Sequence, residues 1–314
     1  MAVPTSPLAG LALCLVGPGR VGSSLAFWAV ARGARLEAVA GRSVGPARKL
    51  AERLGARAVA LQELDSAGAD LLLVAVADGA IAGVAELLAR RPQAPVALHT
   101  SGALGASALG ALERAGSATG TLHPLRAFPR PLPDPTAAAG TFFALDGAPA
   151  ARELGERLAA AFGGTSGVVP EAARELYHLA ASVAAGGTAT LVASAAELAR
   201  RLGLPAGVAG GYLELARGAL GELAREGARA EAEPARGGAD LGRAITGPVA
   251  RGDFATFLRE LESLRRLDGL EPRLELFARL AFETVRLARG GEEAGRLAGA
   301  LESAGFLDPP RDGC

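Results

Sequence analysis

The sequence contains very little cysteine, and this scarcity excludes a fold held together by disulfide bonds. Cys14 and Cys314 are the only cysteines among 314 residues, which is too few for a disulfide framework and suits a reducing compartment. The first ten residues lack the charged start and apolar core of a signal peptide, and no apolar run reaches membrane-spanning length. We therefore expect a soluble cytoplasmic protein with no membrane partner.

The chain also lacks an excess of charge and has few aromatic side chains. Lys plus Arg equals Asp plus Glu at 33 residues each, so the composition gives no sign of a nucleic-acid partner. The basic residues are mostly arginines scattered along helical segments, a pattern typical of solvated helix faces. Aromatic residues make up 4% of the chain although 50% of it is hydrophobic, so Ala, Leu and Val must build the core. The length suits two domains.

Glycine, in contrast, is abundant, and one group of glycines forms the strongest motif. Residues 11–16 are an apolar run of strand length, and an amphipathic helical segment follows at 23–32. The loop between them consists of Gly17, Pro18, Gly19, Arg20, Val21 and Gly22. In a dinucleotide-binding loop Gly17 would allow a tight turn, Gly19 would let the backbone approach a pyrophosphate, and Gly22 would let the helix pack on the strand. We predict that this loop binds a dinucleotide; the alternative is a glycine-tolerant turn.

The end of the second strand favours NADP over NAD. Residues 36–40 are expected to form this strand, which leads into Gly41, Arg42 and Ser43. NAD-preferring folds place an acidic residue near this point to bind the adenosine ribose. Arg42 and Ser43 stand there instead, and a guanidinium can hold a 2′-phosphate through paired hydrogen bonds. We predict NADP as the cofactor; in the alternative interpretation Arg42 only caps the edge of the sheet.

The rest of the N-terminal half alternates strands with helices, which predicts an α/β Rossmann-like domain with a mostly parallel sheet over residues 1–168. Strands are expected at 11–16, 36–40, 57–60, 70–77, 95–98, 119–122, 141–145 and 167–169, and helices at 23–32, 47–54, 79–90, 103–114 and 150–162. The continuous apolar run at 70–77 favours a central strand. Ala77 and Asp78 close it and are counted among the cofactor-binding residues, although Asp78 is also well placed to be the N-cap of the next helix.

Two of the three histidines follow strands of this domain, at the sheet edge where open α/β folds bind ligands. His99 follows the strand at 95–98 and stands just before Ser101, and His123 follows the strand at 119–122. We expect each histidine to contact substrate or nicotinamide; the alternative for each is a structural role. A loop with four prolines at 128–136 is expected to be rigid and to cover the cofactor cleft.

From residue 169 onward the pattern is helical, which predicts an all-α C-terminal domain over residues 169–314. Helices are expected at 171–185, 191–202, 208–226, 254–267, 271–288 and 292–303. Similar segments recur without a fixed period, which favours a bundle over a solenoid. Residues 227–240 are rich in Ala, Gly, Glu and Arg, and we expect a solvated helix end or loop there.

The first of these helices contains the third histidine. His178 and Ser182 lie four residues apart, so their side chains share one helix face. A histidine can deliver or remove a proton near neutral pH, as hydride transfer to a carbonyl or imine requires. A core histidine bonded to a backbone carbonyl is an equally good interpretation.

A turn further along contains two more candidate site residues. Gly and Pro fix this turn, and Asp253 is expected to cap the helix that begins at Phe254. Thr246 and Arg251 are harder to explain structurally and are candidates for lining the cleft. The chain has no Ser-His-Asp order, no CxxC and no HExxH, so it gives no support to a hydrolase or to a bound metal.

Taken together, these motifs resemble a family of predicted oxidoreductases in which a Rossmann-like domain precedes a DUF2520 domain. The motifs run in family order up to about residue 288 and are Gly17-Pro-Gly-Arg-Val-Gly22, Gly41-Arg-Ser43, Ala75-Val-Ala-Asp78, His99-Thr-Ser-Gly102, Leu122-His-Pro-Leu125, Tyr177-His178 and Thr246-Gly-Pro-Val-Ala-Arg-Gly-Asp253. The wider kin resemble pyrroline-5-carboxylate reductase, ketopantoate reductase, prephenate dehydrogenase and the β-hydroxyacid dehydrogenases.

The resemblance implies an NADP-dependent oxidoreductase that acts on a small oxo acid or imine bound between the domains. Prephenate dehydrogenases carry a His-Pro pair whose histidine meets substrate, so the resemblance makes His123 the first catalytic candidate, with His178 and Ser101 beside it. The candidate substrate-binding residues are His99, Ser182, Thr246 and Arg251. Related folds dimerise through such helical domains, which implies a homodimer.

The chain departs from the family pattern at two places. Gly186 stands about where the family usually carries Asn, and Arg259 and Glu260 stand near where a His is often found. An alternative function is therefore a non-catalytic NADP-binding module that senses redox state and reports it to a partner protein. A third possibility is a fold that binds no ligand.

Overall fold

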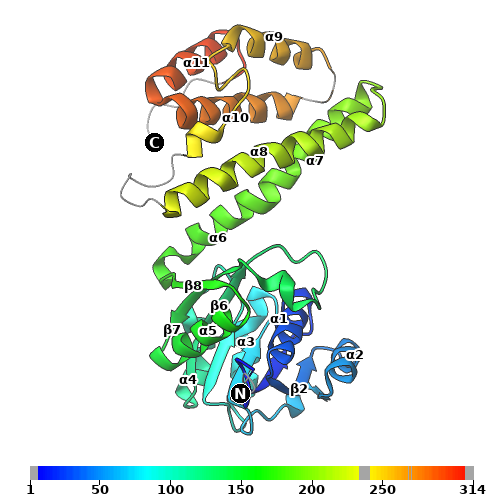
Figure 1. Ribbon diagram of the computed structural model, residues 1–314, viewed down its shortest axis with the longest axis vertical. Coiled ribbons are helices and arrows are strands. Elements are labelled where there is room, and N and C mark those ends of the chain that lie inside the picture. The colour runs from blue at the N-terminus through cyan, green and yellow to red at the C-terminus, as the bar shows by residue number, and fades with distance from the viewer. Residues whose placement is uncertain (1–5, 233–240, 268, 270, 308–314) are drawn as a thin grey trace, which may run out of the picture. The chain divides into compact units, whose positions relative to one another are not determined.

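The computed structural model describes residues 6–232, 241–267, 269 and 271–307 and separates into two compact units, Met1–Thr188 and Ala189–Cys314 (Figure 1). The division falls beyond the boundary expected at residue 168, so the first helical turns after the sheet belong to the N-terminal unit. The reason is a buried side chain, Arg174, which bonds this segment to the sheet.

The N-terminal unit is built on one sheet of eight strands in the order β3-β2-β1-β4-β5-β6-β7-β8. The strands are β1 Ala12–Val16, β2 Arg35–Gly41, β3 Arg57–Ala60, β4 Leu71–Val74, β5 Val96–His99, β6 Ala118–Leu125, β7 Phe142–Gly147 and β8 Thr165–Val168. All neighbouring strands are parallel except β6 and β7. The predicted Rossmann-like, mostly parallel sheet is therefore confirmed.

The α-helices of this unit are α1 Arg20–Ala31, α2 Val44–Leu54, α3 Asp78–Leu88, α4 Gly110–Arg114, α5 Pro149–Ala161 and α6 Arg174–Ser182. The helix expected at 103–114 begins late, with a 3-10 turn at Ala106–Leu109 before α4. The delay has a local cause, because the Ser101 hydroxyl accepts hydrogen bonds from the backbone N–H groups of Ala103 and Leu104. A π-helical turn, Val183–Gly187, follows α6 and contains Gly186.

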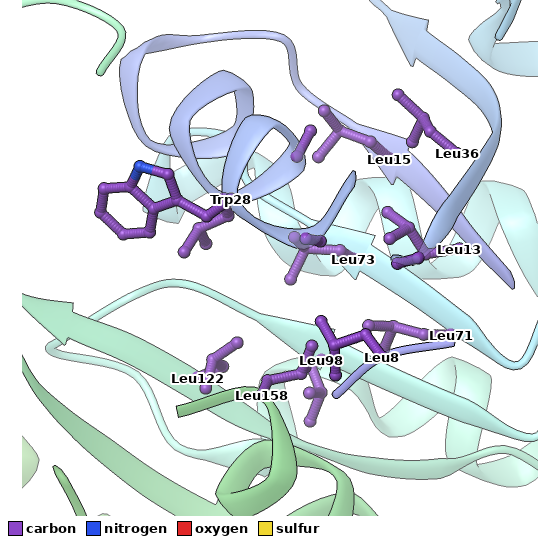
Figure 2. Close-up of a cluster of buried hydrophobic side chains, with 14 of the residues drawn as sticks. Leu8, Leu13, Leu15, Trp28, Leu36, Leu71, Leu73, Leu98, Leu122 and Leu158 are labelled. Atoms are coloured by element: carbon purple, nitrogen blue, oxygen red, sulfur yellow. The ribbon is translucent and has the colours of Figure 1, made fainter. Parts of the chain in front are cut away.

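The core of this unit consists of two apolar clusters, and β1 shows how the sequence divides side chains between them. Leu13 and Leu15 belong to one cluster, drawn in Figure 2, whereas Cys14 and Val16 belong to the other. Successive side chains of a strand point to opposite faces, so a continuous apolar run fills both clusters at once. Cys14 is buried without a disulfide partner among the described residues, and burial raises the pKa of its thiol to about 11.

The second unit is helical, as predicted. Its α-helices are α7 Thr188–Arg201, which begins at the unit boundary, α8 Gly207–Ala232, α9 Phe254–Arg265, α10 Glu271–Arg289 and α11 Gly291–Ser303. A core of Leu, Ala and Val packs around α9, α10 and α11. Ion pairs between arginine and glutamate three or four residues apart lie on the exposed helix faces, as between Arg279 and Glu275. This confirms that the arginine-rich pattern marks solvated helix faces.

Two further expectations concern this half of the chain. Asp253 caps α9 as predicted, since its carboxylate accepts a hydrogen bond of 3.2 Å from the Thr256 N–H. Residues 227–240, expected to be a solvated helix end or loop, are helical as far as Ala232, and their remainder lies outside the described residues, as does Cys314.

One helical stretch contradicts the expectation that no apolar run reaches membrane-spanning length. Glu171–Arg201 is long and apolar enough to cross a membrane by length and composition alone, and no other helix in the described segments is. Its most apolar window has a mean hydropathy of 1.5, and none of that window is buried. The expectation of no such run was wrong because only Ser, Thr and Gly interrupt the apolar residues over 179–196, and these residues lower the mean hydropathy little.

Candidate functional site

The glycine loop lies where the strand order of the sheet reverses, between β1 and β4. Open α/β sheets bind ligands at this switch point, outside the carboxyl ends of the strands. Gly17 has a φ of +96°, and a Cβ there would lie 2.4 Å from the Ala75 carbonyl oxygen after β4. A Cβ at Gly22 would lie 2.2 Å from the Gly17 carbonyl oxygen. The structure thus confirms the tight turn at Gly17 and the close helix–strand packing at Gly22.

The first turn of α1 leaves room and hydrogen-bond donors for an anion. A Cβ at Gly19, the N-cap residue, would meet no atom within 4 Å. No side chain caps the helix, and no acidic residue occupies its first turn, so the terminal N–H groups and the positive end of the helix dipole face outward. Gly19, Arg20 and Val21 line a groove of about 360 Å³. This cradle fits the pyrophosphate of a dinucleotide.

The residues expected to select NADP lie beside this loop. Gly41 ends β2 close to Pro18, since a Cβ there would lie 3.1 Å from the Pro18 Cδ atom. Arg42 and Ser43 follow and are exposed. Ser43 is the N-cap residue of α2, but its hydroxyl makes no capping bond. Both side chains are therefore available to a ligand at this corner.

Ala77 and Asp78 line the same groove from its other side. The N-cap of α3 is Ala77. Asp78 is the first residue of the helix, and its side chain makes no capping hydrogen bond. The capping role considered for Asp78 was therefore wrong by one position. Its carboxylate still lies at the positive end of the helix dipole, where negative charge is favourable.

His99 proves to be a support for the site. It is the last residue of β5 and is fully buried. Its Nδ1 accepts a hydrogen bond of 3.2 Å from the Ser101 N–H, and its Nε2 lies 2.8 Å from the Gly105 carbonyl oxygen, to which it donates. Neither nitrogen is left for the substrate contact expected from the sequence. Burial is the main cause that lowers the pKa of His99, in keeping with a neutral ring.

Ser101 is likewise engaged by its own loop. The side chain is 4% exposed, and its hydroxyl accepts the two backbone bonds that delay the next helix. Its carbonyl oxygen accepts a hydrogen bond of 3.3 Å from Arg174 Nη1. Ser101 borders the groove, but its hydrogen bonds all hold the conformation of the loop after β5.

His123 lies within β6 and not just after it, because the antiparallel pairing with β7 extends the strand to Leu125. Its Nδ1 is 2.9 Å from the Tyr177 hydroxyl. The His178 ring stands nearly perpendicular to the His123 ring, with 6.1 Å between the ring centroids. The structure thus brings His123 and His178 together and adds Tyr177, which the sequence offered only as part of a motif.

Gly102 makes this juxtaposition possible. A Cβ at this position would lie 2.6 Å from His178 Cδ2 and 2.8 Å from His123 Nε2. Only glycine lets the loop after β5 pass directly beneath both rings.

His123 is a neutral imidazole at physiological pH. Burial, followed by the neighbouring His178 and the charge of Arg174, lowers the pKa of His123 to about 4. Burial also raises the pKa of the Tyr177 hydroxyl. The pair therefore consists of two uncharged groups joined by a hydrogen bond, as seen when a neutral histidine serves as a hydrogen-bond donor to substrate.

Arg174 holds this arrangement in place and was missed in the sequence. Its side chain is fully buried, with hydrogen bonds to the Ser101 carbonyl, the Thr121 hydroxyl and the Ala144 carbonyl. Its Nε is 3.9 Å from an Asp146 carboxylate oxygen. The available signal was its spacing, since it precedes Tyr177 and His178 by one helical turn and so shares their helix face.

A second pocket meets the groove at the two histidines. It has a volume of about 620 Å³ and mostly apolar walls. The walls come from the end of β6 with the loop after it, and from α6 with the π-helical turn. Four residues line both cavities: His123, Pro124, Arg126 and His178.

The proline-rich loop packs on α1. The Trp28 Nε1–H donates a hydrogen bond of 3.1 Å to the Asp134 carbonyl, and the Leu132 N–H donates one of 2.8 Å to the Ser24 hydroxyl. Phe128, at the start of the loop, lines the groove. The loop therefore borders the groove through one aromatic side chain.

The remaining candidates are placed as follows. Ser182 lines the second pocket, and its hydroxyl donates a hydrogen bond of 3.0 Å to the His178 carbonyl. Thr246 and Arg251 lie in the other unit, in the turn before α9, and both are exposed. Their part in substrate binding stays a prediction. In the described segments no group of three or more His, Cys, Asp or Glu could hold a metal ion.

Comparisons with known proteins identify both halves of the chain. Residues 6–124 match the Rossmann-like domain, and residues 141–284 match the domain of unknown function DUF2520. The chain thus has the two-domain organisation that its motifs indicated. No curated protein matches the sequence.

Several solved structures share the fold. Protein TM1727 from Thermotoga maritima is 24% identical, with a TM-score of 0.66 over 90% of this chain and 98% of its own. A Bacteroides fragilis protein, BF3122, provisionally named an NADP oxidoreductase, is 23% identical, with a TM-score of 0.66 over 90% of this chain and all of its own. The pyrroline carboxylate reductase of Plasmodium falciparum, solved with NADP bound, is 15% identical, with a TM-score of 0.56 over 92% of this chain and 98% of its own.

Proposed function

We propose that the protein is an NADP-dependent oxidoreductase that transfers hydride to or from a small oxo acid or imine. The observation that carries this proposal is the meeting of the dinucleotide-type groove with a second, apolar pocket at His123 and His178. The fold shared with an NADP-bound reductase supports it. A substrate in the second pocket would face the end of the groove, which is the geometry that hydride transfer needs.

The cofactor would be held by the glycine loop and the open end of α1, with Arg42 and Ser43 on the 2′-phosphate. When bound, a nicotinamide cofactor supplies or accepts a hydride. The residues of this chain must bind the substrate's carbonyl oxygen or imine nitrogen, exclude water and move the accompanying proton.

We assign the proton step to His123 and Tyr177. If the Tyr177 hydroxyl donates to Nδ1, the neutral His123 ring carries its proton on Nε2, the atom next to Gly102 and the groove. As hydride reaches the substrate carbon, Nε2–H gives its proton to the developing anion while Tyr177 gives its proton to Nδ1. His123 ends neutral, and the Tyr177 phenolate recovers a proton from solvent. His178 packs against this ring and borders both cavities, where it contacts the substrate.

The test is thermal stability with NADPH, NADP, NADH and NAD, on wild type, Arg42→Ala and Arg90→Ala. A ligand stabilises the folded state by RT ln(1 + [L]/Kd), so even micromolar binding raises the melting temperature at millimolar cofactor. We expect the phosphorylated forms to stabilise wild type more, and Arg42→Ala to remove that preference by weakening NADPH about 10-fold or more. Exposed Arg90 follows the other end of α3, and its variant should behave as wild type.

If no cofactor changes the melting temperature, the proposal fails. If cofactor binds but His123→Ala and His178→Ala leave turnover of an oxo acid and imine panel unchanged, the catalytic assignment fails. Binding by wild type without any turnover would favour the redox-sensing module instead.

A further inference from the structure

Arg126 is held by uncharged groups, unlike the arginines of this chain that pair with a carboxylate. Its Nε donates a hydrogen bond of 2.7 Å to the Thr141 hydroxyl, and its Nη2 donates one of 3.0 Å to the Ala139 carbonyl. Both acceptors are uncharged, and no carboxylate among the described residues pairs with it. Elsewhere, as at Arg217 and Arg286, arginines pair with a glutamate three residues away.

The backbone fixes the base of this side chain as well. Arg126 follows the last residue of β6, and its N–H donates a hydrogen bond of 2.8 Å to the Pro124 carbonyl. A guanidinium has five N–H donors, and these two bonds leave Nη1 without an acceptor among the described residues. A rigidly held guanidinium with free donors loses little entropy when it binds an anion.

The position of Arg126 determines what it can bind. It borders the groove and the second pocket, together with His123 and His178. No acidic residue lines the second pocket, whose other walls are mainly alanine, with Pro124 and Leu125. A ligand that matches this pocket has an apolar body and one anionic group.

We infer that Arg126 binds the carboxylate of the substrate and so restricts the enzyme to acids, whether 2-oxo acids or imino acids. The inference rests on the proposed function only in treating the second pocket as the substrate site. With the carboxylate on Arg126, the neighbouring carbonyl or imine group falls beside His123 and His178, which line the same pocket. Esters, amides and simple ketones would leave the guanidinium without an anion.

Binding of hexanoate and of its uncharged counterpart hexanamide tests this inference by titration calorimetry on the full chain, with and without NADP. We expect wild type to bind hexanoate about 10-fold or more tightly than hexanamide, as charge-assisted hydrogen bonds give. Arg126→Gln should abolish the difference, and Arg126→Lys should retain part of it, because the charge stays but the planar fork is lost. Thr141→Val should also weaken hexanoate, since it removes an anchor of the guanidinium.

Arg130→Gln is the matched control, because Arg130 is exposed in the following loop and borders neither cavity. The inference is overturned if wild type shows no preference for hexanoate, if Arg130→Gln loses it equally, or if Arg126→Gln weakens NADP instead. Cofactor binding to wild type is measured separately. Failure there would overturn the proposed function, whereas cofactor binding without the hexanoate preference would overturn only the role of Arg126.

Discussion

His99 and His123 lie on neighbouring strands and are both kept uncharged, but for different purposes. His99 uses its two nitrogens to hold the backbone of the Ser101 loop. His123 uses Nδ1 on Tyr177 and leaves Nε2 beside Gly102. Burial is the main cause of the low pKa of both rings, and the charge of Arg174 lowers it further. A cation beneath the site therefore favours the neutral form that a hydrogen-bond donor needs.

This predicts a loss of stability on acidification. The pKa of His123 falls from 6.5 to about 4 on folding, so between these values the unfolded chain binds a proton that the folded chain does not. The free energy of unfolding should therefore decrease as the pH falls from about 6.5 to 4, by up to about 1.4 kcal/mol per pH unit from this residue. Urea unfolding of wild type and His123→Gln over this range measures the effect. Equal pH slopes for the two proteins would contradict the prediction.

At the scale of single residues, the sequence was sufficient to select His123, His178 and the glycine loop as candidates, because each belongs to a local motif. It could not separate the roles of His99 and His123, since both follow apolar strand residues. Their difference arises from their partners: His99 bonds Gly105 in its own loop, whereas His123 bonds Tyr177, which lies 54 residues away in sequence. Arg126 and Arg174 were missed because the chain contains many arginines, and only their bonds distinguish them.

At the scale of elements, the start of α6 decides whether the site forms. Arg174 enters beneath the loop after β5 and bonds groups on β6 and β7. Tyr177 and His178 come one turn later in α6. The bonds of Arg174 therefore fix the axial position and the rotation of the helix that carries them. Most helix positions gain stability from apolar contact, whereas α6 is attached by a buried polar side chain and exposes Leu176 and Leu179.

Replacing Arg174 with Met should therefore have two separable effects. The buried acceptors lose their partner, which should cost about 2–4 kcal/mol in the free energy of unfolding. Loss of the positive charge should also raise the pKa of His123, measured by NMR titration of its ring protons. Arg174→Lys keeps the charge and should keep the low pKa while losing part of the stability. An unchanged His123 pKa in Arg174→Met would show that the charge has no such role.

The order and type of nearly all elements could be predicted from apolar runs and glycines, with ends correct to within a few residues. Two differences from the expected elements arise from contacts between elements. The strand expected at 119–122 continues to Leu125 because β7 pairs with it, and the compact N-terminal unit extends past α6, where Arg174 binds the sheet. Neither contact leaves a local pattern in the sequence.

At the scale of the whole molecule, apolar side chains remain exposed on the helices after the sheet. Leu176 is 72% exposed and Val183 63%, and in the other unit Leu215 is 72% exposed. We propose that exposed apolar side chains of the helical domain, Leu215 among them, form the interface of the expected homodimer.

We predict that wild type elutes as a dimer in size-exclusion chromatography with light scattering, because a second copy would cover these side chains. Leu215→Glu should shift it toward monomer by placing a charge in the interface. Leu125→Glu, at an exposed position on β6, is the matched control and should remain dimeric. A monomeric wild type at all concentrations, or recovery of the chain with membranes through the 171–201 stretch, would contradict the proposal.

The contact between the proline-rich loop and α1 has an optical consequence. Trp28 is the only tryptophan in the chain and is fully buried, and its ring lies 5.8 Å from that of Phe128, which borders the groove. Its ultraviolet emission overlaps the absorption of a reduced nicotinamide, so a bound one should quench the fluorescence by energy transfer while the oxidised form does not. If the proposed cofactor binds, Trp28 would serve as a built-in reporter of its redox state, readable without a label or a known substrate.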